Sequence, residues 1–409
     1  MKMKIALFVP SWPPGSMANG IVTYVAYLAP ALRQLGHQVY LLTHELTTHD
    51  QNSGKDFRTI DLRRYAHRPT VRDRIVFRIS PATALFNRAS CSIAAAIGEL
   101  VENEKLDVLE MEESFGWSLA ISRLNLLPVI VRLHGPWFVN GRRFDYYGSV
   151  INRRREKREG GGIRDAQIVT SPSANVIQAV KDYYSLNLRE SRVIPNPIQA
   201  AFERDTWDLA TCCEDTLLFV GGIDRRKGTD LVLRAFVSLA TQYPRLSLTV
   251  VGPDRGIPGP AGKIFSFEEF VRANVPEWIR PRIEYLGPVS NYDLMSLRTK
   301  YFATIVASRY EIMPYSVLEA MSLGCPLIAT AVGGIPELIT DHRNGLLVPS
   351  EDPKAITDAC HKLLSDKALA ARLGNRAWRD CRDLYSPNNI AQQTLATYRL
   401  AIDEFKLRS

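Results

Sequence analysis

The chain of 409 residues and 46.0 kDa is too long for one ordinary hydrophobic core, so its length predicts two domains. Hydrophobic residues make up 46% and charged residues 23% of the chain, a balance that excludes an intrinsically disordered protein. The six cysteines form neither a CxxC pair nor a metal-ligand spacing, so we expect reduced thiols, no disulfide framework and no metal site.

The net charge of +8 is concentrated in two basic clusters of the first half. A basic cluster is often only a solvated helix face. The alternative is attraction to an anionic partner, either a lipid-diphosphate acceptor or an acidic membrane surface. Nucleic acid is not expected, because the clusters contain no recognisable reading motif. The clusters comprise Arg63, Arg64, Arg68, Arg72, Arg74 and Arg78, and Arg142, Arg143, Arg153, Arg154, Arg155, Lys157 and Arg158.

The start of the chain is basic and then apolar, as in a signal peptide. Its apolar stretch Ile5–Val9 is too short for one, however, and Pro10 follows at once. No uninterrupted apolar run reaches the roughly 18 residues that a membrane-spanning helix requires. We therefore expect a buried first strand and a cytoplasmic protein, which the basic clusters could bring to the inner face of the membrane.

Short apolar runs alternate with helical segments through the first half of the chain. A loop of Pro, Gly and Asn follows the first strand, and a helix from about Ile21 to Leu35 ends at Gly36. This alternation predicts a parallel sheet with helices on both faces. Further strands are expected at His37–Thr43, Val108–Glu110, Val129–Leu133, Ile168–Thr170 and Val193–Ile194.

The pattern restarts after Ile194–Pro197, where two prolines flank Asn196 and indicate a linker. We expect domains at residues 1–197 and 198–385, with ligands bound in the cleft between them, and a C-terminal helix over 386–409 that packs back on the first domain. The second domain is expected to contain strands at Leu217–Val220, Leu246–Val251, Ile283–Leu286, Ala303–Val306 and Pro326–Thr330, and helices at Thr229–Tyr243 and Tyr315–Leu323.

The most informative segment, residues 308–348, reads SRYEIMPYSVLEAMSLGCPLIATAVGGIPELI and ends in NGLLV. Pro314 stands at or just before a helix start, where Ser316 can satisfy a free amide. Glu311 before the helix and Glu319 within it can face one cleft and accept hydrogen bonds from sugar hydroxyls. The exposed amides at the helix start can bind an anion. We therefore expect the donor site to include Met313, Pro314, Tyr315 and Ser316.

In this setting the sequence resembles the retaining glycosyltransferases of family 4. That family has the GT-B fold, in which two Rossmann-like α/β domains face each other across a deep cleft. Glutamates eight residues apart also occur elsewhere in the chain, so the surrounding LEAM, GCPLI and GGIPE segments carry the resemblance. In the family the first glutamate contacts the donor sugar and the second contacts the ribose of the nucleotide. The resemblance assigns these roles to Glu311, as a catalytic residue, and to Glu319.

A second signal is the loop FVGGIDRRKG at residues 219–228. A strand that ends in glycines and is followed by clustered cations suits a diphosphate bound close to the backbone. The loop resembles the phosphate-clamping loop of family 4, with Lys227 in the expected place. The family usually has arginine where Gly222 stands, so one clamping cation is missing, and Arg225 or Arg226 is expected to substitute for it.

Two loops of the first half extend the resemblance. His134 and Gly135 close a strand where the family places a histidine–glycine pair beside the donor sugar. The resemblance therefore implies that His134 hydrogen-bonds the sugar or helps to carry charge at the reacting carbon. Gly20 is the second glycine of the family's glycine-rich donor loop, with Asn19 in place of the first. Weaker matches cover nearly the whole chain except residues 253–282, which indicate an insertion with its own helix.

These signals predict a hexosyltransferase that moves a sugar from a nucleotide-sugar to a glycan or lipid-linked acceptor, with UDP-sugars favoured and GDP-sugars second. The resemblance implies retention and an α-linkage. Because no nucleophile is evident, a front-face substitution is expected in which the departing phosphate takes the acceptor's proton. No cofactor beyond the nucleotide-sugar and no metal are expected, because Lys227, an arginine and a helix N-terminus would stabilise the leaving diphosphate and no convincing DxD motif is present.

Two alternatives remain. A sugar-nucleotide epimerase with the GT-B fold would share the architecture but would need acid–base carboxylates around the sugar. A non-catalytic nucleotide-sugar-binding scaffold would have lost turnover, and the glycine at Gly222 in place of arginine favours it to a degree.

Overall fold

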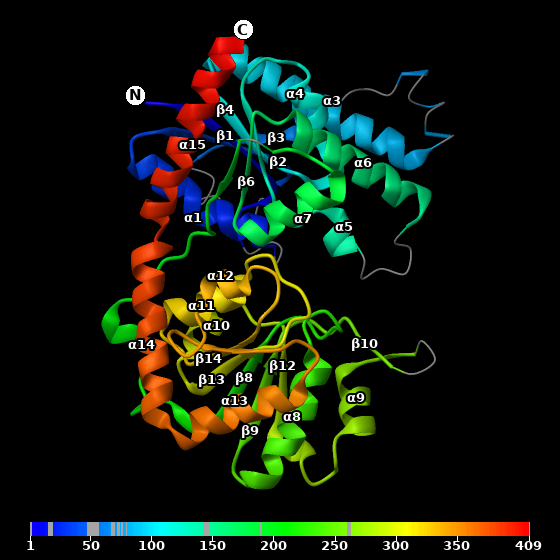
Figure 1. Ribbon diagram of the computed structural model, residues 1–409. Helices are drawn as coiled ribbons and strands as arrows, with labels where there is room; N and C mark the ends of the chain where they lie inside the picture. The colour runs from blue at the N-terminus through cyan, green and yellow to red at the C-terminus, as the bar shows by residue number, and fades with distance from the viewer. Residues whose placement is uncertain are drawn as a thin grey trace. The chain divides into compact units, whose positions relative to one another are not determined.

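The computed structural model describes residues 2–14, 19–46, 57–66, 70, 71, 74, 77, 78, 80–141, 148–188, 190–259 and 263–408. The chain divides into two compact units (Figure 1), one formed by Met1–Pro197 with Pro387–Ser409 and the other by Ile198–Ser386. Part of the expected glycine-rich loop, residues 15–18, lies outside the described residues. So do four arginines of the basic clusters, Arg68, Arg72, Arg142 and Arg143.

The first unit is built on a sheet whose described strands all pair in parallel, in the order β3-β2-β1-β4-β5-β6-β7. Ile5 pairs with Val39 on one side and with Val108 on the other, so β1 is a central strand. Burial on both faces explains the continuous apolar run of β1, and β4 is buried along its whole length although it contains Glu110 and Glu112. The strands are β1 (Lys4–Trp12), β2 (Gln38–Leu46), β3 (Arg58–Asp61), β4 (Val108–Glu112), β5 (Val129–Arg132), β6 (Ile168–Ser171) and β7 (Ser191–Val193).

Helices cover this sheet, and the sequence explains where several of them begin. Asn19 caps the first helix, because its Oδ1 accepts a hydrogen bond from the amide of Ile21 at 2.8 Å. Ser149 caps the arginine-rich helix in the same way, by accepting from the amide of Asn152. The helices are α1 (Gly20–Gln34), α3 (Pro81–Glu104), α4 (Trp117–Ser122), α5 (Trp137–Asn140), α6 (Val150–Asp165), α7 (Ala174–Tyr184) and α15 (Pro387–Arg408).

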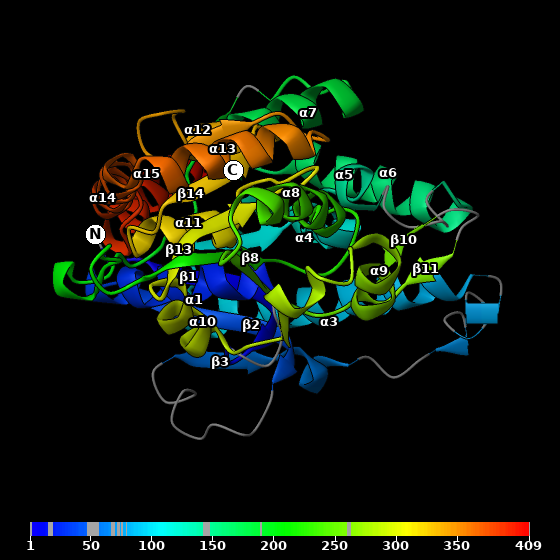
Figure 2. The same ribbon diagram turned by 90° about the horizontal axis from the view of Figure 1, so that it is seen from below.

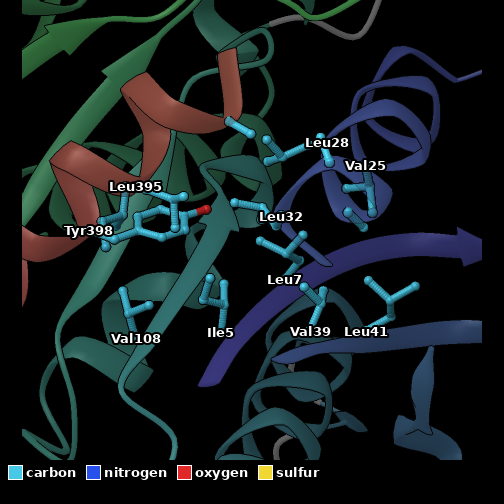
Figure 3. Packing of buried hydrophobic residues seen from close by; sticks show 14 of the residues in the cluster. Ile5, Leu7, Val25, Leu28, Leu32, Val39, Leu41, Val108, Leu395 and Tyr398 are labelled. Atoms are coloured by element: carbon cyan, nitrogen blue, oxygen red, sulfur yellow. The ribbon is translucent and has the colours of Figure 1, made fainter. Parts of the chain in front are cut away.

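The last helix of the chain completes the core of the first unit. Leu395 and Tyr398 of α15 lie in one buried cluster with Leu28 and Leu32 of α1 and with residues of β1 and β4 (Figure 3). Tyr398 is fully buried. Burial of this kind contributes about 1.5–3 kcal/mol per large apolar side chain, so α15 is an integral part of the first unit.

One stretch of α3, Thr83–Glu104, is long and apolar enough to cross a membrane when judged by length and composition alone. Arg88 and Glu99 interrupt it, which is why no uninterrupted apolar run is visible in the sequence. Its Ile93 and Ile97 are fully buried within the unit. An apolar helix face packed on a sheet gives the same composition, so the stretch is weak evidence for a membrane span.

The second unit repeats the plan with a sheet whose strands also pair in parallel, in the order β12-β9-β8-β13-β14-β15. Its strands are β8 (Cys213–Val220), β9 (Ser247–Val251), β12 (Ile283–Gly287), β13 (Tyr301–Val306), β14 (Leu327–Thr330) and β15 (Leu346–Val348). Its helices are α8 (Thr229–Gln242), α10 (Asn291–Arg298), α11 (Tyr315–Ser322), α12 (Ile335–Leu338), α13 (Pro353–Ser365) and α14 (Lys367–Leu384).

Residues 253–282 form a separate small element within the second unit, which contains the helix expected there. Two short strands, β10 (Ile257–Pro258) and β11 (Ile264–Phe265), pair in antiparallel fashion beside helix α9 (Phe267–Asn274), as Figures 1 and 2 show. A capping box between Ser266 and Glu269 fixes the start of α9.

In each sheet, the predicted site loops follow the carboxyl ends of the strands. In parallel α/β sheets, ligands bind at the carboxyl ends of the strands. The RRKG loop follows β8, the loop before α11 follows β13, the loop before Gly20 follows β1 and the His134 loop follows β5.

Candidate functional site

The RRKG loop after β8 is held in a shape that only glycine permits at its end. Gly228 has a φ of +75°, and a Cβ atom there would lie 2.0 Å from the carbonyl oxygen of Ala307. Within the loop, Oδ1 of Asp224 accepts a hydrogen bond from the amide of Lys227 at 2.8 Å. The backbone therefore turns tightly and directs Lys227 away from the helix that follows.

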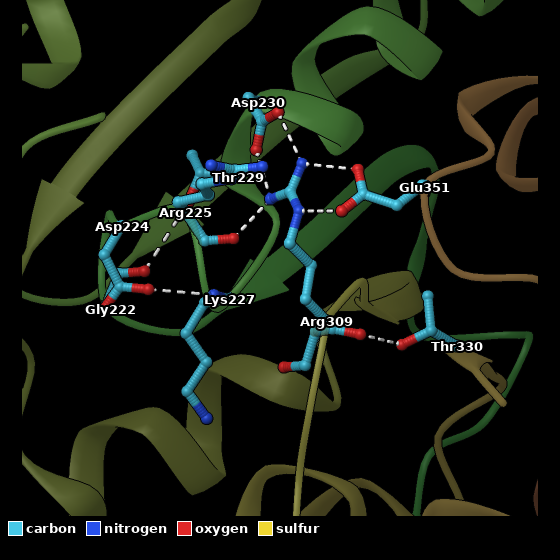
Figure 4. A network of polar contacts seen from close by, with 10 residues as sticks. Gly222, Asp224, Arg225, Lys227, Thr229, Asp230, Arg309, Thr330 and Glu351 are labelled. Carbon is cyan, nitrogen blue, oxygen red and sulfur yellow. Dashed lines mark hydrogen bonds and ion pairs between the residues drawn. The ribbon is translucent and has the colours of Figure 1, made fainter. Parts of the chain in front are cut away.

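Arg309, in the loop after the neighbouring strand β13, anchors this turn, as Figure 4 shows. Its guanidinium binds both oxygens of Asp230 at 2.8 Å and forms a second two-point contact with Glu351. Its backbone amide donates to the carbonyl of Arg226 at 2.8 Å, and its Nη1 donates to the carbonyl of Arg225. The planar guanidinium suits such paired contacts, so Arg309 fixes the position of the cationic loop. Sequence reasoning assigned no role to this residue.

Glu311 lies beside the cations of the loop. Its Oε1 accepts hydrogen bonds from Nζ of Lys227 at 2.5 Å, from Nη1 of Arg226 at 3.2 Å and from Oγ of Ser308 at 2.8 Å. Burial raises the pKa of the Glu311 carboxyl, but the charges of Lys227 and Arg226 outweigh burial, and the pKa is lowered overall. The structure thus brings together the predicted sugar-binding carboxylate and the predicted phosphate-binding cations.

The GGIPE segment holds the backbone of Glu311. Gly333 has a φ of +54°, and a Cβ atom there would lie 1.7 Å from the carbonyl oxygen of Glu311. The amide of Gly334 donates to the same carbonyl at 3.1 Å. Glycine at position 333 is therefore required for the close approach of two chain segments that orients Glu311.

The start of α11 corrects one expectation. Pro314 is the residue just before the helix, as predicted, but Ser316 does not cap it. Ser316 is the second residue of the helix, whereas a capping side chain belongs to the residue that precedes the first turn, and proline has no acceptor there. The buried Oγ of Ser316 has no hydrogen-bond partner among the described residues. The helix start thus offers the hydroxyl of Ser316, beside Tyr315 and the buried Met313.

Glu319 contacts a residue that sequence reasoning missed. Its Oε2 accepts a hydrogen bond from Nη2 of Arg298 at 2.8 Å. Arg298 is the last residue of α10, and its side chain is 0% exposed, whereas that of Glu319 is 16% exposed. Nε and Nη1 of Arg298 have no partner among the described residues. A buried arginine at the end of a polar helix gives no signal in the sequence, because its partner is 21 residues away.

The cation that replaces the family's arginine at Gly222 has three candidates in the structure. Arg226 is partly buried and contacts Glu311, whereas Arg225 is exposed. Arg255, in the loop after the neighbouring strand β9, lies closer to the position itself. Its Cζ would be 3.7 Å from a Cβ atom at Gly222. Arg255 was missed because only the parallel pairing of β8 and β9 brings the two loops together.

In the first unit, the side-chain carboxyl group of Glu113 holds the backbone around His134. The amides of His134 and Gly135 donate to the two oxygens of Glu113 at 2.8 and 2.7 Å. The imidazole is only partly exposed and packs edge-on against Tyr24, with 5.2 Å between ring centroids. Burial and the charge of Arg132 lower the pKa of His134 well below its usual value of 6.5. The ring is therefore neutral, which favours hydrogen bonding to a sugar over carrying positive charge.

Buried glutamates surround this loop, and sequence reasoning did not identify them. Burial raises the pKa of Glu112 to about 7, and burial with the nearby charge of Glu159 raises that of Glu113 to about 8. The carboxylate of Glu159 joins three segments of the unit, because it accepts hydrogen bonds from the amides of Phe115 and Trp137 and from Nε of Arg155. The only signal is the run EMEE at the carboxyl end of a strand.

Gly20, the predicted donor-loop glycine, is exposed at the first position of α1.

Two family models match the chain in succession. Residues 18–202 match Glycosyltransferase Family 4, and residues 214–366 match Glycosyl transferases group 1. A D-inositol 3-phosphate glycosyltransferase from Nocardioides sp. is 32% identical over 197 residues, which are 46% of this chain and 42% of that protein. The chain thus matches less than half the length of this relative.

Solved structures share the fold over almost the whole chain. Sucrose-phosphate synthase from Thermosynechococcus elongatus has a TM-score of 0.75 and 22% identity, over 98% of this chain and 100% of that one. Anabaena HepE, solved in complex with UDP-glucose, has a TM-score of 0.66 and 14% identity, over 97% of this chain and 100% of that one. These likenesses identify the two parallel-sheet units as a GT-B fold. Because the two family models follow each other over most of its length, the chain belongs to glycosyltransferase family 4.

Proposed function

We propose that the protein transfers a sugar from a nucleotide-sugar to a glycan or lipid-linked acceptor, with retention at the anomeric carbon and an α-linkage. The observation that carries this proposal is the contact of Glu311 with Lys227 and Arg226. A carboxylate that binds sugar hydroxyls and cations that bind a diphosphate must be neighbours, because the sugar and the phosphate are joined by one bond in the donor.

The proposed donor is a UDP-sugar, with GDP-sugars second. The crystallised complex of HepE with UDP-glucose supports this order, since that protein has the same fold. In this chain, Glu319 would accept hydrogen bonds from the ribose hydroxyls. The amides at the start of α11 and the hydroxyl of Ser316 would face the diphosphate.

The proposed chemistry is a front-face substitution. The acceptor oxygen forms a bond to the anomeric carbon while the bond from that carbon to the donor phosphate breaks, and the departing phosphate oxygen takes the acceptor's proton. Lys227 and a loop arginine would stabilise the negative charge that develops on the leaving diphosphate. We propose that no metal is needed for this step. Activity that survives EDTA supports this, and complete loss that is reversed by added Mg²⁺ would contradict it.

A calorimetric panel of UDP, GDP, ADP and TDP tests the donor assignment, with Glu319→Ala as the site variant. Glu268→Ala, an exposed glutamate on α9, is the matched control. We expect one nucleotide to bind the wild type and the control equally, and to bind Glu319→Ala about tenfold or more weakly, because a charge-assisted hydrogen bond is lost. Failure of all four nucleotides to bind would contradict the proposal.

Turnover separates the transferase from its two alternatives. A transferase consumes the nucleotide-sugar only when an acceptor is supplied or hydrolysis occurs, and releases the nucleoside diphosphate. An epimerase would convert the nucleotide-sugar into its epimer, which NMR detects directly. A scaffold would bind the donor and leave it unchanged.

A further inference from the structure

A pocket of about 820 Å³ lies on the first unit, and none of the residues assigned to the donor lines it. It is lined by residues at the start of α3, in and just after α4, along α6 and at the end of α7, and α4 packs against both α3 and α6. Its lining comprises Ser80, Thr83, Leu119, Arg123, Arg154, Lys157, Arg158, Gly160, Gly161, Arg164, Tyr184 and Leu186.

The lining is strongly cationic. It contains five basic side chains and no acidic one. Two of the five, Arg123 and Arg164, share one carboxylate, that of Asp165, at 3.4 and 2.7 Å. The other three follow each other at helical spacing on one face of α6 and have no carboxylate within 4 Å among the described residues: Arg154, Lys157 and Arg158.

Uncompensated charge of this kind contrasts with the second unit. There, Arg376 contacts Asp380 at 2.7 Å and Arg382 contacts Asp383 at 2.8 Å, so each of these two arginines has a carboxylate close by. On α6, like charges three and four residues apart repel one another. A bound anion removes this repulsion.

Neutral contacts hold the two arginines in place. Nη1 of Arg154 donates to Oγ of Ser80 at 3.1 Å, and Nη2 of Arg158 donates to Oγ1 of Thr83 at 3.4 Å. The guanidinium of Arg158 also lies 3.9 Å from the ring centroid of Phe86. Burial and the charge of Arg154 lower the pKa of Arg158. These contacts orient the guanidinium groups without neutralising them, which lowers the entropic cost of binding an anion.

Glycines shape the floor of the pocket. A Cβ atom at Gly160 would lie 2.6 Å from the ring of Tyr184, and one at Gly161 would lie 3.1 Å from Leu119. The absence of side chains at these positions lets α6 pack tightly against both neighbours. The long basic side chains therefore stand on a rigid wall rather than on a mobile surface segment.

We infer that this pocket binds a phosphate-bearing group through Arg154, Lys157 and Arg158. Guanidinium groups bind phosphate oxygens with paired hydrogen bonds, and lysine adds a third charge. The group is either a soluble phosphate or the phosphate of a lipid headgroup. Ile151, which is 58% exposed, lies one turn before Arg154 on the same face of α6, where an apolar side chain can meet the lipid surface. The inference goes beyond the proposed function, because none of the pocket residues is assigned to the donor.

The test uses the double substitution Arg154→Gln/Arg158→Gln, with Arg376→Gln/Arg382→Gln as a control that changes the net charge equally. All samples, including the reference, carry Lys227→Ala, so that phosphate binding at the donor loop is weakened equally in all of them. Two probes distinguish the sources of phosphate. Inorganic pyrophosphate is titrated by calorimetry, and vesicles of phosphatidylcholine with or without phosphatidylglycerol are used for co-sedimentation.

We expect the reference and the control to bind at least one probe, and the pocket variant to bind it about tenfold or more weakly. Binding of pyrophosphate alone identifies a soluble phosphate ligand, and binding of the anionic vesicles alone identifies a lipid headgroup. Equal losses in the pocket and control variants would mean that overall charge is responsible, and would overturn the inference. Failure of both probes to bind the reference protein would overturn it too.

Discussion

Arg298 and Glu319 form a pair in which a fully buried guanidinium holds a partly exposed carboxylate at 2.8 Å. The carboxylate keeps an edge toward solvent, where a ribose could bind, while the arginine fixes its orientation. Arg298 is therefore a positioning residue for the proposed nucleotide contact. It touches the carboxylate and acts on the nucleotide only through it.

Replacing Arg298 with methionine tests this relationship. We expect Arg298→Met to bind UDP about tenfold more weakly and to distinguish UDP from 2′-deoxy-UDP less well than the wild type, because the freed Glu319 no longer faces the ribose. Calorimetry with both nucleotides measures the difference. Arg298→Lys, which keeps the charge, should restore part of the discrimination. A variant that weakens both nucleotides equally would show a merely structural role.

The second clamping cation is tested by three single substitutions. We expect Arg226→Ala and Arg255→Ala to weaken nucleotide binding more than Arg225→Ala, because Arg226 contacts Glu311 and Arg255 lies next to Gly222, whereas Arg225 does neither. Comparison of UDP with uridine in the same titration isolates the phosphate contribution. The loss should be confined to UDP. If Arg225→Ala has the largest effect, the assignment from side-chain position is wrong.

Gly333→Ala should disturb both stability and activity. A residue other than glycine with positive φ costs about 1 kcal/mol, and here the added Cβ atom would also meet the carbonyl of Glu311 at 1.7 Å. Gly36→Ala is the control, since Gly36 has a φ of +88° with nothing within 4 Å. We expect the control to lose about 1 kcal/mol of unfolding free energy and Gly333→Ala to lose about 3 kcal/mol or more. Urea unfolding measures both losses, and similar values would contradict the argument.

Glu113 makes stability depend on pH. Its folded pKa of about 8 lies above the ordinary value of 4.5, so the folded protein retains a proton that the unfolded chain releases between these values. The contribution to the unfolding free energy is complete below pH 4.5 and declines as the pH rises through about 8, by at most about 1.4 kcal/mol per pH unit. Glu113→Gln should lack this decline. Urea unfolding across this pH range measures the decline, with Glu268→Gln as a control. Parallel curves for the wild type and Glu113→Gln would contradict the prediction.

Local sequence patterns predicted most of the secondary structure. The strand at Ile5–Val9 and the helix from Ile21 to Leu35 lie within a few residues of β1 and α1, because apolar runs and the glycine at Gly36 are local signals. The short edge strand β3 escaped notice, since four partly exposed residues carry little apolar pattern.

The site was predictable only where neighbours in sequence are neighbours in space or a family motif names them. Glu311 and Lys227 were found through motifs, and the structure joins them. Arg298 and Arg255 were not found, because each reaches its partner across the packing of separate strands and helices. Glu113 was missed because burial, which makes it unusual, is a property of the folded unit and not of the letters around it.

The contribution of α15 to the core of the first unit also constrains how the chain is made. Tyr398 and Leu395 fill space between α1, β1 and β4, so the first unit is interrupted by the whole of the second. On the ribosome, residues 198–386 form a continuous segment that can fold as soon as it emerges. Residues 1–197 cannot complete their core until α15 has been synthesised. Until then, the apolar surface that α15 covers stays exposed. A chaperone that shields this apolar surface would therefore act on the nascent chain at least while residues 198–386 are translated.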